Sequence, residues 1–511
     1  MRTGHPPRHA VGNRADYSPG PAWYPPAIPL HTGRAGTRQE AGSLGDRVAA
    51  VPQPPELVRG LGLLDATLLI VGSVIGSGIF FAPSIMAGYL QSPGLLLGLW
   101  VLGGLLTLAG ALSYAELAAA LPRAGGQYVF LKEALSPVFG FLYGWTLLVA
   151  INTGFVAAVA VAFAKTLGFF VPVIGEEHLL LSASGLRLST AQAVALLVIA
   201  VLTWLNVTGL RTGAAVQNTF TVAKLAAIAA LVLLAVVTQR GSTANFRPLL
   251  GLALGPEGLR LGLFAALAGA MSKALFAYDS WTTVTFAAEE VEQPERNLPR
   301  SLLTGTLAIT AAYVAALAVY LYLVPIGEMA RVAENRIATE AAVRMIGPAG
   351  GAFVALAVLV STFGCVNGLT LAGARVVFAM GRDGVFFRRA AAVHPRYRTP
   401  AAALVLHGVV AAALTLTGTY SNLLTLTAFS SLLFNVLTVV GLFVLRRKRP
   451  DLPRPYRVWA YPVVPLSYVA VALFFLVYMP VADPRDTGMG LLLTAAGVPA
   501  YLYWRSGRAR A

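Results

Sequence analysis

From about residue 63 onward the chain alternates between long apolar runs and short polar segments. A membrane-spanning helix needs about 20 consecutive, mostly apolar residues, and these runs have that length. We therefore predict an all-α integral membrane protein with twelve transmembrane helices. Their positions are about 63–89, 94–120, 137–168, 190–208, 214–238, 260–286, 300–325, 351–380, 400–418, 422–445, 461–480 and 488–504.

The segment before the first apolar run has a different character. Residues 1–56 are rich in Pro, Gly and Arg and contain no apolar run of the kind found in a signal peptide. We expect this segment to be a disordered basic tail, followed by a polytopic membrane domain over residues 57–510.

The composition excludes a soluble enzyme. Hydrophobic residues make up 57% of the chain and charged residues only 12%, whereas soluble domains carry about 25% charged residues. The net charge of +16 arises from bases between the apolar runs, so it indicates membrane topology rather than nucleic-acid binding. The bases gather in alternate loops, such as 446–457, while Gln91–Pro93 and Gly418–Ser421 have none. The positive-inside rule then places both termini in the cytoplasm.

The first predicted helix contains an unusual run of small residues. Gly72–Phe80 includes three glycines and two serines in mid-membrane, and glycine costs about 1 kcal/mol in a helix interior relative to alanine. Gly72 and Gly76 fit a small-residue packing face. Gly76 and Gly78 lie two residues apart and hence on different faces, which favours an unwound segment. Both interpretations stay open.

The sixth predicted helix is interrupted in a similar way. Phe276–Trp281 places Asp279 and Ser280 in mid-membrane, where either could cap a restarted half-helix. Interruptions five helices apart indicate an inverted five-helix repeat with a site near the membrane midplane. The repeats would cover about 60–240 and 258–447, with two extra helices at about 461–504.

Unwound backbone in mid-membrane predicts the chemistry of such a site. Half-helix N-termini favour an anion, and half-helix C-termini with open carbonyls favour a cation. One small zwitterion satisfies both, and an α-amino acid has this layout of charge.

Several motifs in order along the chain carry a family resemblance. They are Gly76-Ser77-Gly78-Ile79-Phe80, Ser113–Leu117, Phe220–Leu225, Phe276–Trp281, Glu289–Pro299, Phe363–Gly368 and Phe434-Asn435. Together they resemble the amino acid–polyamine–organocation superfamily, and most of all its L-type amino acid transporter branch with its bacterial relatives. The resemblance implies a LeuT-like fold with twelve helices, a 5+5 inverted repeat and broken helices 1 and 6. It also implies transport by alternating access.

The resemblance assigns site residues as well. It implies that the substrate carboxylate binds the backbone N–H groups of Gly76, Ser77 and Gly78. The ammonium would bind the backbone carbonyls of four residues, namely Val74, Ile75, Phe276 and Ala277. Phe276 resembles an aromatic gate. Trp281 and Asn435 either shape the pocket or serve helix packing.

Lys224 lies near the middle of the fifth predicted helix, where a lysine is costly unless it is paired or snorkels to the interface. In related sodium-coupled transporters a sodium ion occupies this area beside the unwound first helix. The resemblance therefore implies that the Lys224 ammonium replaces sodium and makes transport sodium-independent. A buried lysine can also titrate, so proton coupling stays open.

Asp279 departs from the many L-type relatives that have glycine there. Relatives with aspartate include transporters of cationic as well as neutral amino acids, so Asp279 could bind a cationic side chain. The alternatives are a helix cap, or a salt bridge to Lys273 or Lys224. Lys273 could snorkel, line a vestibule or pair with an acid, and we expect Glu116 to pair with a base at the interface.

These observations predict a sodium-independent permease or exchanger for neutral and, through Asp279, cationic L-amino acids. The alternatives are a proton-coupled permease for another small amine or metabolite, and a transporter-derived sensor. We find no catalytic motif, so neither enzymatic activity, metal nor cofactor is expected. The expected partners are the amino acid and membrane lipid. The animal L-type transporters that the chain resembles pair with a single-span glycoprotein through a cysteine between their third and fourth helices. The corresponding loop, Phe170–Ser189, has no cysteine, so the resemblance does not extend to a disulfide-linked subunit, and none is expected.

Overall fold

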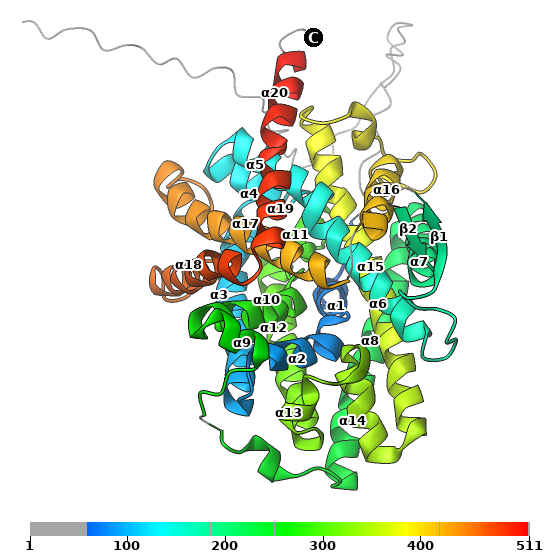
Figure 1. Cartoon of the computed structure of the whole chain (residues 1–511). Helices are drawn as coiled ribbons and strands as arrows, with labels where there is room; N and C mark the ends of the chain where they lie inside the picture. Colours follow the sequence, from blue (N-terminus) through cyan, green and yellow to red (C-terminus); the bar gives the residue numbers. More distant parts are fainter. Residues whose placement is uncertain (1–58, 184–185, 250, 418–419, 509–511) are drawn as a thin grey trace, which may run out of the picture. The chain divides into compact units, whose positions relative to one another are not determined.

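The computed structural model describes residues 59–183, 186–249, 251–417 and 420–508 (Figure 1). In this part of the chain the structure is helical apart from one two-stranded antiparallel sheet. The predicted helical class is therefore confirmed. The predicted tail, residues 1–56, lies outside the described residues.

The helices and strands up to residue 261 include both pieces of the first predicted membrane helix. They are α1 (Leu63–Val74), α2 (Gly78–Tyr89), α3 (Pro93–Ala120), α4 (Gln127–Ala134), α5 (Pro137–Thr146), the π-helix η1 (Leu147–Ile151), α6 (Asn152–Leu167), β1 (Leu179–Ala183), β2 (Leu186–Ser189), α7 (Thr190–Val207), α8 (Leu210–Thr238), the 3₁₀ helix η2 (Thr243–Phe246) and α9 (Pro256–Leu261).

The remaining elements begin with the sixth predicted membrane helix. They are α10 (Leu263–Tyr278), α11 (Thr283–Phe286), η3 (Ala288–Glu290), α12 (Pro294–Leu323), α13 (Ile326–Met329), η4 (Ala333–Asn335), α14 (Ile337–Ile346), α15 (Pro348–Arg382), η5 (Arg388–Ala391), α16 (Ala401–Thr417), α17 (Tyr420–Lys448), α18 (Val463–Ala482), α19 (Pro484–Ala495) and α20 (Gly497–Arg508).

The described residues contain nine helices long and apolar enough to cross a membrane, the first of which combines α1 and α2. Two shorter apolar helices, Leu263–Tyr278 and Ala401–Leu416, coincide with the sixth and ninth predicted spans. The chain is therefore a multi-pass membrane protein. The twelfth predicted span is divided between α19 and α20. Pro499 follows this division closely, and its missing N–H explains why one continuous helix does not form.

Local sequence explains where several helices begin. Ser92 precedes α3 and accepts a hydrogen bond from the Leu95 backbone N–H at 3.3 Å, and Pro93 occupies the first helical position. Ser189 and Gln192 form a reciprocal capping box at the start of α7. These caps end the connections sharply and set where the long apolar helices start.

Candidate functional site

Both predicted helix interruptions are present. Residues 75–77 separate α1 from α2, and residues 279–282 separate α10 from α11 (Figure 1). Ser280 adopts a positive φ of 72°, which is uncommon for a residue with a side chain. All residues of the two interruptions are buried. The backbone N–H and C=O groups of these buried segments need hydrogen-bond partners outside a regular helix. The two segments therefore present polar backbone groups within the protein interior.

The helices beside the two interruptions touch each other where Gly78, the first residue of α2, meets Ala277 near the end of α10. A Cβ atom at Gly78 would lie 2.5 Å from the Cβ of Ala277 and 2.6 Å from its Cα. At Gly76 it would lie 2.7 Å from the Cys365 Sγ, and at Gly72 only 2.0 Å from the Gln217 side chain. Small-residue packing and unwinding are therefore both real features of this segment. Of these three glycines, Gly78 is the one that lies against the helix before the second break.

Tyr313 on α12 joins the two breaks through its hydroxyl. The hydroxyl oxygen lies 2.9 Å from the Val74 carbonyl oxygen and 2.9 Å from that of Ala277. Both carbonyls belong to the set predicted to hold the substrate ammonium. A phenol has one proton, so it donates fully to only one of them at a time. This role could not be predicted from the sequence, because Tyr313 is one of several tyrosines in an apolar helix.

Lys224 on α8 reaches the interrupted first helix, as predicted. Its Nζ donates to the carbonyl oxygens of Gly72 at 2.9 Å, Ile75 at 2.7 Å and Ser361 at 2.9 Å. The Ser361 hydroxyl also donates to the Ile75 carbonyl, at 3.0 Å. Ile75 therefore uses both acceptor positions of its carbonyl within the protein. The ammonium of Lys224 does not snorkel to the membrane surface but ties α1 to α15.

The amides predicted to bind a carboxylate lie at the start of α2. The Gly76 N–H donates to the Val74 carbonyl at 2.8 Å. Gly78 is the first residue of α2, and its neighbour Ser77 accepts a hydrogen bond from the Phe80 N–H at 3.1 Å. In this conformation a bound anion would have to replace the internal partner of Gly76.

Asp279 lines a small cavity between α10, α3, α17 and α18. The cavity leaves about 20 Å³ for the centres of water molecules, and Thr107, Ser431 and Asn435 also line it. One Asp279 oxygen, Oδ1, accepts a hydrogen bond from the Ser280 N–H at 2.5 Å, a local cap. The other, Oδ2, is buried and has no hydrogen-bond partner among the described residues. Such a cavity is large enough for one water molecule.

Two of the alternatives for Asp279 are wrong. Lys224 binds carbonyls, as described above. Lys273 lies 3.3 Å from the Asp483 carboxylate and 2.6 Å from the Thr425 hydroxyl. The alternative in which Lys273 pairs with an acid is therefore the correct one. Asp483 lies at the end of α18, so the sequence did not indicate this partner.

The three predicted pocket residues with larger side chains occupy defined positions. The Phe276 ring stacks on Phe155 of α6, with centroids 4.7 Å apart. Trp281 lines the Asp279 cavity and packs edge-on against Tyr114 at 4.7 Å. Asn435 lines the same cavity and accepts hydrogen bonds from Tyr114 at 2.7 Å and Gln127 at 3.2 Å. Asn435 thus serves both the cavity and helix–helix bonding.

The segment after α11 is tied to both α15 and the chain before α1. Glu290 and Arg375 form an ion pair at 2.8 Å in which both side chains are almost fully buried. The Glu290 carbonyl accepts the backbone N–H groups of Gly60 and Leu61, each at 3.0 Å. These bonds therefore hold the start of the first interrupted helix next to the end of the sixth.

A second ion pair lies beside the first at the protein surface. Glu289 pairs with Arg382 at 2.6 Å. Burial raises the pKa of Glu289, but its hydrogen bonds with Arg382 and the charge of Arg382 outweigh burial, so its pKa lies below the usual value. The bases in these pairs are on α15, which the sequence did not suggest.

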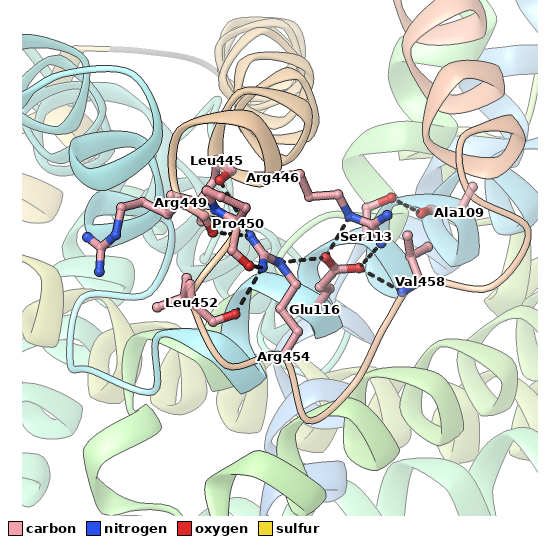
Figure 2. Close-up of polar contacts among 10 residues, drawn as sticks. All are labelled: Ala109, Ser113, Glu116, Leu445, Arg446, Arg449, Pro450, Leu452, Arg454 and Val458. Atoms are coloured by element: carbon pink, nitrogen blue, oxygen red, sulfur yellow. Dashed lines mark hydrogen bonds and ion pairs between the residues drawn. The ribbon is translucent and has the colours of Figure 1, made fainter.

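Glu116 on α3 pairs with bases, as predicted. Figure 2 shows its carboxylate facing Arg446 and Arg454, at 2.6 Å and 3.4 Å, and it also accepts the Val458 N–H at 2.8 Å. Arg454 binds several backbone carbonyls of the same loop, including that of Leu452 at 2.9 Å. This network anchors the connection between α17 and α18 to the end of α3.

Interrupted helices that bring polar backbone together in mid-membrane are typical of membrane transport proteins. In the described part of the chain no cluster of three or more His, Cys, Asp and Glu could hold a metal ion. The chain belongs to the amino acid permease family, whose sequence model matches residues 61–498. The resemblance to the amino acid–polyamine–organocation superfamily is thereby confirmed, as is the prediction of a transporter rather than an enzyme.

Three relatives illustrate the match. The chain is 30% identical to the serine/threonine exchanger SteT of Bacillus subtilis, over 87% of this chain and 96% of the relative. It is 31% identical to the human large neutral amino acids transporter small subunit 2, over 93% and 84%. It is 30% identical to the human b(0,+)-type amino acid transporter 1, over 84% of each. These relatives support the L-type branch.

Proposed function

We propose that this permease is a sodium-independent amino acid transporter that moves L-amino acids across the cell membrane by alternating access. The position of Lys224 supports the proposed sodium independence. Its ammonium binds three carbonyls, from Gly72, Ile75 and Ser361. Carbonyl oxygens are also what a sodium ion would need there. A fixed cation already supplies the charge, so no ion has to bind from solution.

The substrate would bind at the junction of the two breaks. Its carboxylate would accept from the amides of Gly76, Ser77 and Gly78, at the positive end of α2. Once the Gly76 N–H leaves the Val74 carbonyl to bind the carboxylate, the ammonium would donate to whichever of the Val74 and Ala277 carbonyls does not receive the Tyr313 proton. Phe276 and Ile75 would flank it. Because these contacts are made by backbone, they select the zwitterion and not the side chain.

Neutral substrates are supported by the names of the relatives, which refer to serine/threonine exchange and to large neutral amino acids. Cationic substrates are supported by Asp279. Its Oδ2 has no partner among the described residues and lines a cavity with Ser431 and Asn435. A buried carboxylate oxygen without a hydrogen bond is unfavourable, and the cationic side chain of a lysine or arginine substrate would supply one.

We further propose a LeuT-like arrangement of twelve helices in a 5+5 inverted repeat, with both termini in the cytoplasm. The basic loops support this orientation. It places the Glu290–Arg375 pair on the cytoplasmic side and the connection between α12 and α15 outside. The only cysteine of the sequence, Cys365, is buried against the first helix. The transporter would accordingly work without a disulfide-linked subunit.

The test is uptake by purified protein in proteoliposomes. The panel is labelled leucine, serine, arginine and glutamate, each with and without sodium, a pH gradient or unlabelled amino acid inside. We expect saturable uptake that is unaffected by sodium and stimulated by internal amino acid. Uptake that requires sodium would contradict the role of Lys224. Uptake that requires a proton gradient would favour the proton-coupled alternative, in which the buried Lys224 gains and loses the proton.

A further inference from the structure

A second small cavity lies next to the predicted substrate site, along α2 and α15. Its walls include Phe80, Phe81, Phe169, Arg336, Thr339 and Val358. Phe80 follows Gly78 by two residues on α2. Val358 precedes Ser361, which holds Lys224, by about one turn of α15. The cavity therefore adjoins the central site. In the proposed orientation it lies on the extracellular side.

Arg336 is the charged residue of this cavity. Its Nε is buried and has no hydrogen-bond partner in the described part of the chain. Its guanidinium also forms no ion pair with any described residue. The side chain as a whole is only half-buried, so the guanidinium keeps its charge at physiological pH. The buried Nε is a donor that a bound anion would satisfy.

The acidic residues nearby are engaged elsewhere. Glu334, two residues before Arg336, pairs with Lys165 at 3.1 Å. Glu340, four residues after it, pairs with Arg344 at 2.8 Å, and Arg344 also pairs with Glu328. The loop therefore supplies no carboxylate to Arg336. An anion that binds Arg336 would therefore come from solution.

We propose that Arg336 forms an external docking site for the α-carboxylate of the arriving amino acid, ahead of the central site. This inference rests on the proposed transport function. A guanidinium binds a carboxylate in bidentate fashion, and Phe80, Phe81 and Phe169 offer an apolar wall to the rest of the molecule. Backbone amides at Gly76–Gly78 would then take over the carboxylate as it moves inward.

The size of the cavity limits when the site can be filled. It leaves about 10 Å³ for the centres of water molecules, which is room for one water at most. An amino acid fits only when α14 and the preceding loop separate from α2, against which they pack. Docking therefore belongs to the outward-open conformation, and its loss should affect uptake from one side only.

The experiment compares Arg336→Gln with wild type in proteoliposomes of fixed orientation. We expect the external KM for leucine to rise roughly three- to tenfold, as for loss of one charged hydrogen-bonded contact, with kcat and the internal KM unchanged. Arg336→Lys should recover part of the loss. Arg331→Gln, an exposed position of the same loop, is the matched control and should behave as wild type. An unchanged external KM, or an equal change on both sides, would overturn the proposal.

Two further experiments test which anion binds at Arg336 and whether binding needs a positive charge there. Replacing external chloride by gluconate should leave the wild-type KM unchanged. A rise in KM like that of Arg336→Gln would mean that Arg336 binds an inorganic anion instead. The chain has one cysteine, which is buried, so Arg336→Cys can be labelled selectively. A cationic thiol reagent should lower the external KM again and an anionic one should not. The same recovery with both reagents would overturn the proposal. Absence of all transport in wild type would instead reject the proposed function.

Discussion

Gly78 is the residue with the least freedom to change in this site. Any side chain there would collide with both Cα and Cβ of Ala277, on the opposite helix break. Backbone and Cβ atoms cannot move aside as the end of a flexible side chain can. The proximity of the two breaks, and the amide proposed to bind the carboxylate, thus depend on one missing Cβ.

Replacing Gly78 by alanine should therefore abolish saturable uptake, because the added methyl group pushes α2 away from α10. Gly88→Ala is the control, since it lies in the same helix and a Cβ there meets nothing within 4 Å. Uptake by both variants is compared at equal amounts of folded protein, judged by size-exclusion chromatography. Normal uptake by Gly78→Ala would remove the site from this junction.

Asp279 should discriminate between substrates. Asp279→Asn keeps the size of the side chain and the acceptor that caps Ser280, but it removes the negative charge. We expect the affinity for arginine or lysine to fall about tenfold or more and that for leucine to fall less than about threefold, because only a cationic side chain loses a charged partner. Competition against labelled leucine measures both. Equal losses would mean that Asp279 is only a cap.

Among the elements, the attachment of the segment after α11 to α15 depends on the Glu290–Arg375 ion pair. Removing one partner of a buried ion pair leaves an uncompensated charge and costs about 3–5 kcal/mol, whereas replacing both by apolar residues is often neutral. Glu290→Gln should therefore lower the melting temperature in detergent by several degrees. The double replacement by methionine should restore part of it.

The control for this effect is an exposed pair of the same type. Glu257 and Arg260 lie 2.9 Å apart with their side chains 53% and 73% exposed, so Glu257→Gln should change the melting temperature very little. If Glu290→Gln and Glu257→Gln shifted the melting temperature equally, the Glu290–Arg375 pair would not hold these elements together.

The Glu289–Arg382 pair predicts a dependence on pH. The pKa of Glu289 is lower in the folded protein than in an unfolded chain, so the pair stabilises the folded state fully above about pH 4.3 and loses this effect as pH falls through the lowered pKa. Since both side chains are partly exposed, the effect is below about 1 kcal/mol. The melting temperature of wild type should exceed that of Glu289→Gln at neutral pH and match it in acid. A difference that grows in acid would contradict this sign.

At the scale of the whole molecule, the sequence predicted those features that local composition determines. The positions of the helices follow from the lengths of the apolar runs. Both interruptions follow from residues that disfavour a continuous helix, namely the glycines of 72–78 and the pair Asp279 and Ser280. The bonds of Lys224 to the first helix were implied only by the family resemblance.

The partners of side chains could not be predicted in this way. Tyr313 meets Val74 from 239 residues away, and Arg375 meets Glu290 from 85 residues away. Arg336 is a further example, because the acidic residues near it in the sequence pair with other bases, namely Lys165 and Arg344. Such pairings depend on how helices pack, and neither the hydropathy nor the local motif around these residues records it. The docking site at Arg336 and the Glu290–Arg375 ion pair could therefore be inferred only from the structure.

We propose that the backbone at the junction of the two breaks binds a zwitterion, the feature on which the transport function depends. The most direct measurement is competition against labelled leucine uptake, without sodium, by leucine, by leucinol and by 4-methylpentanoate. Leucinol lacks the carboxylate and 4-methylpentanoate lacks the ammonium, so the account predicts that only leucine competes. Competition by either analogue at the concentration effective for leucine would contradict it.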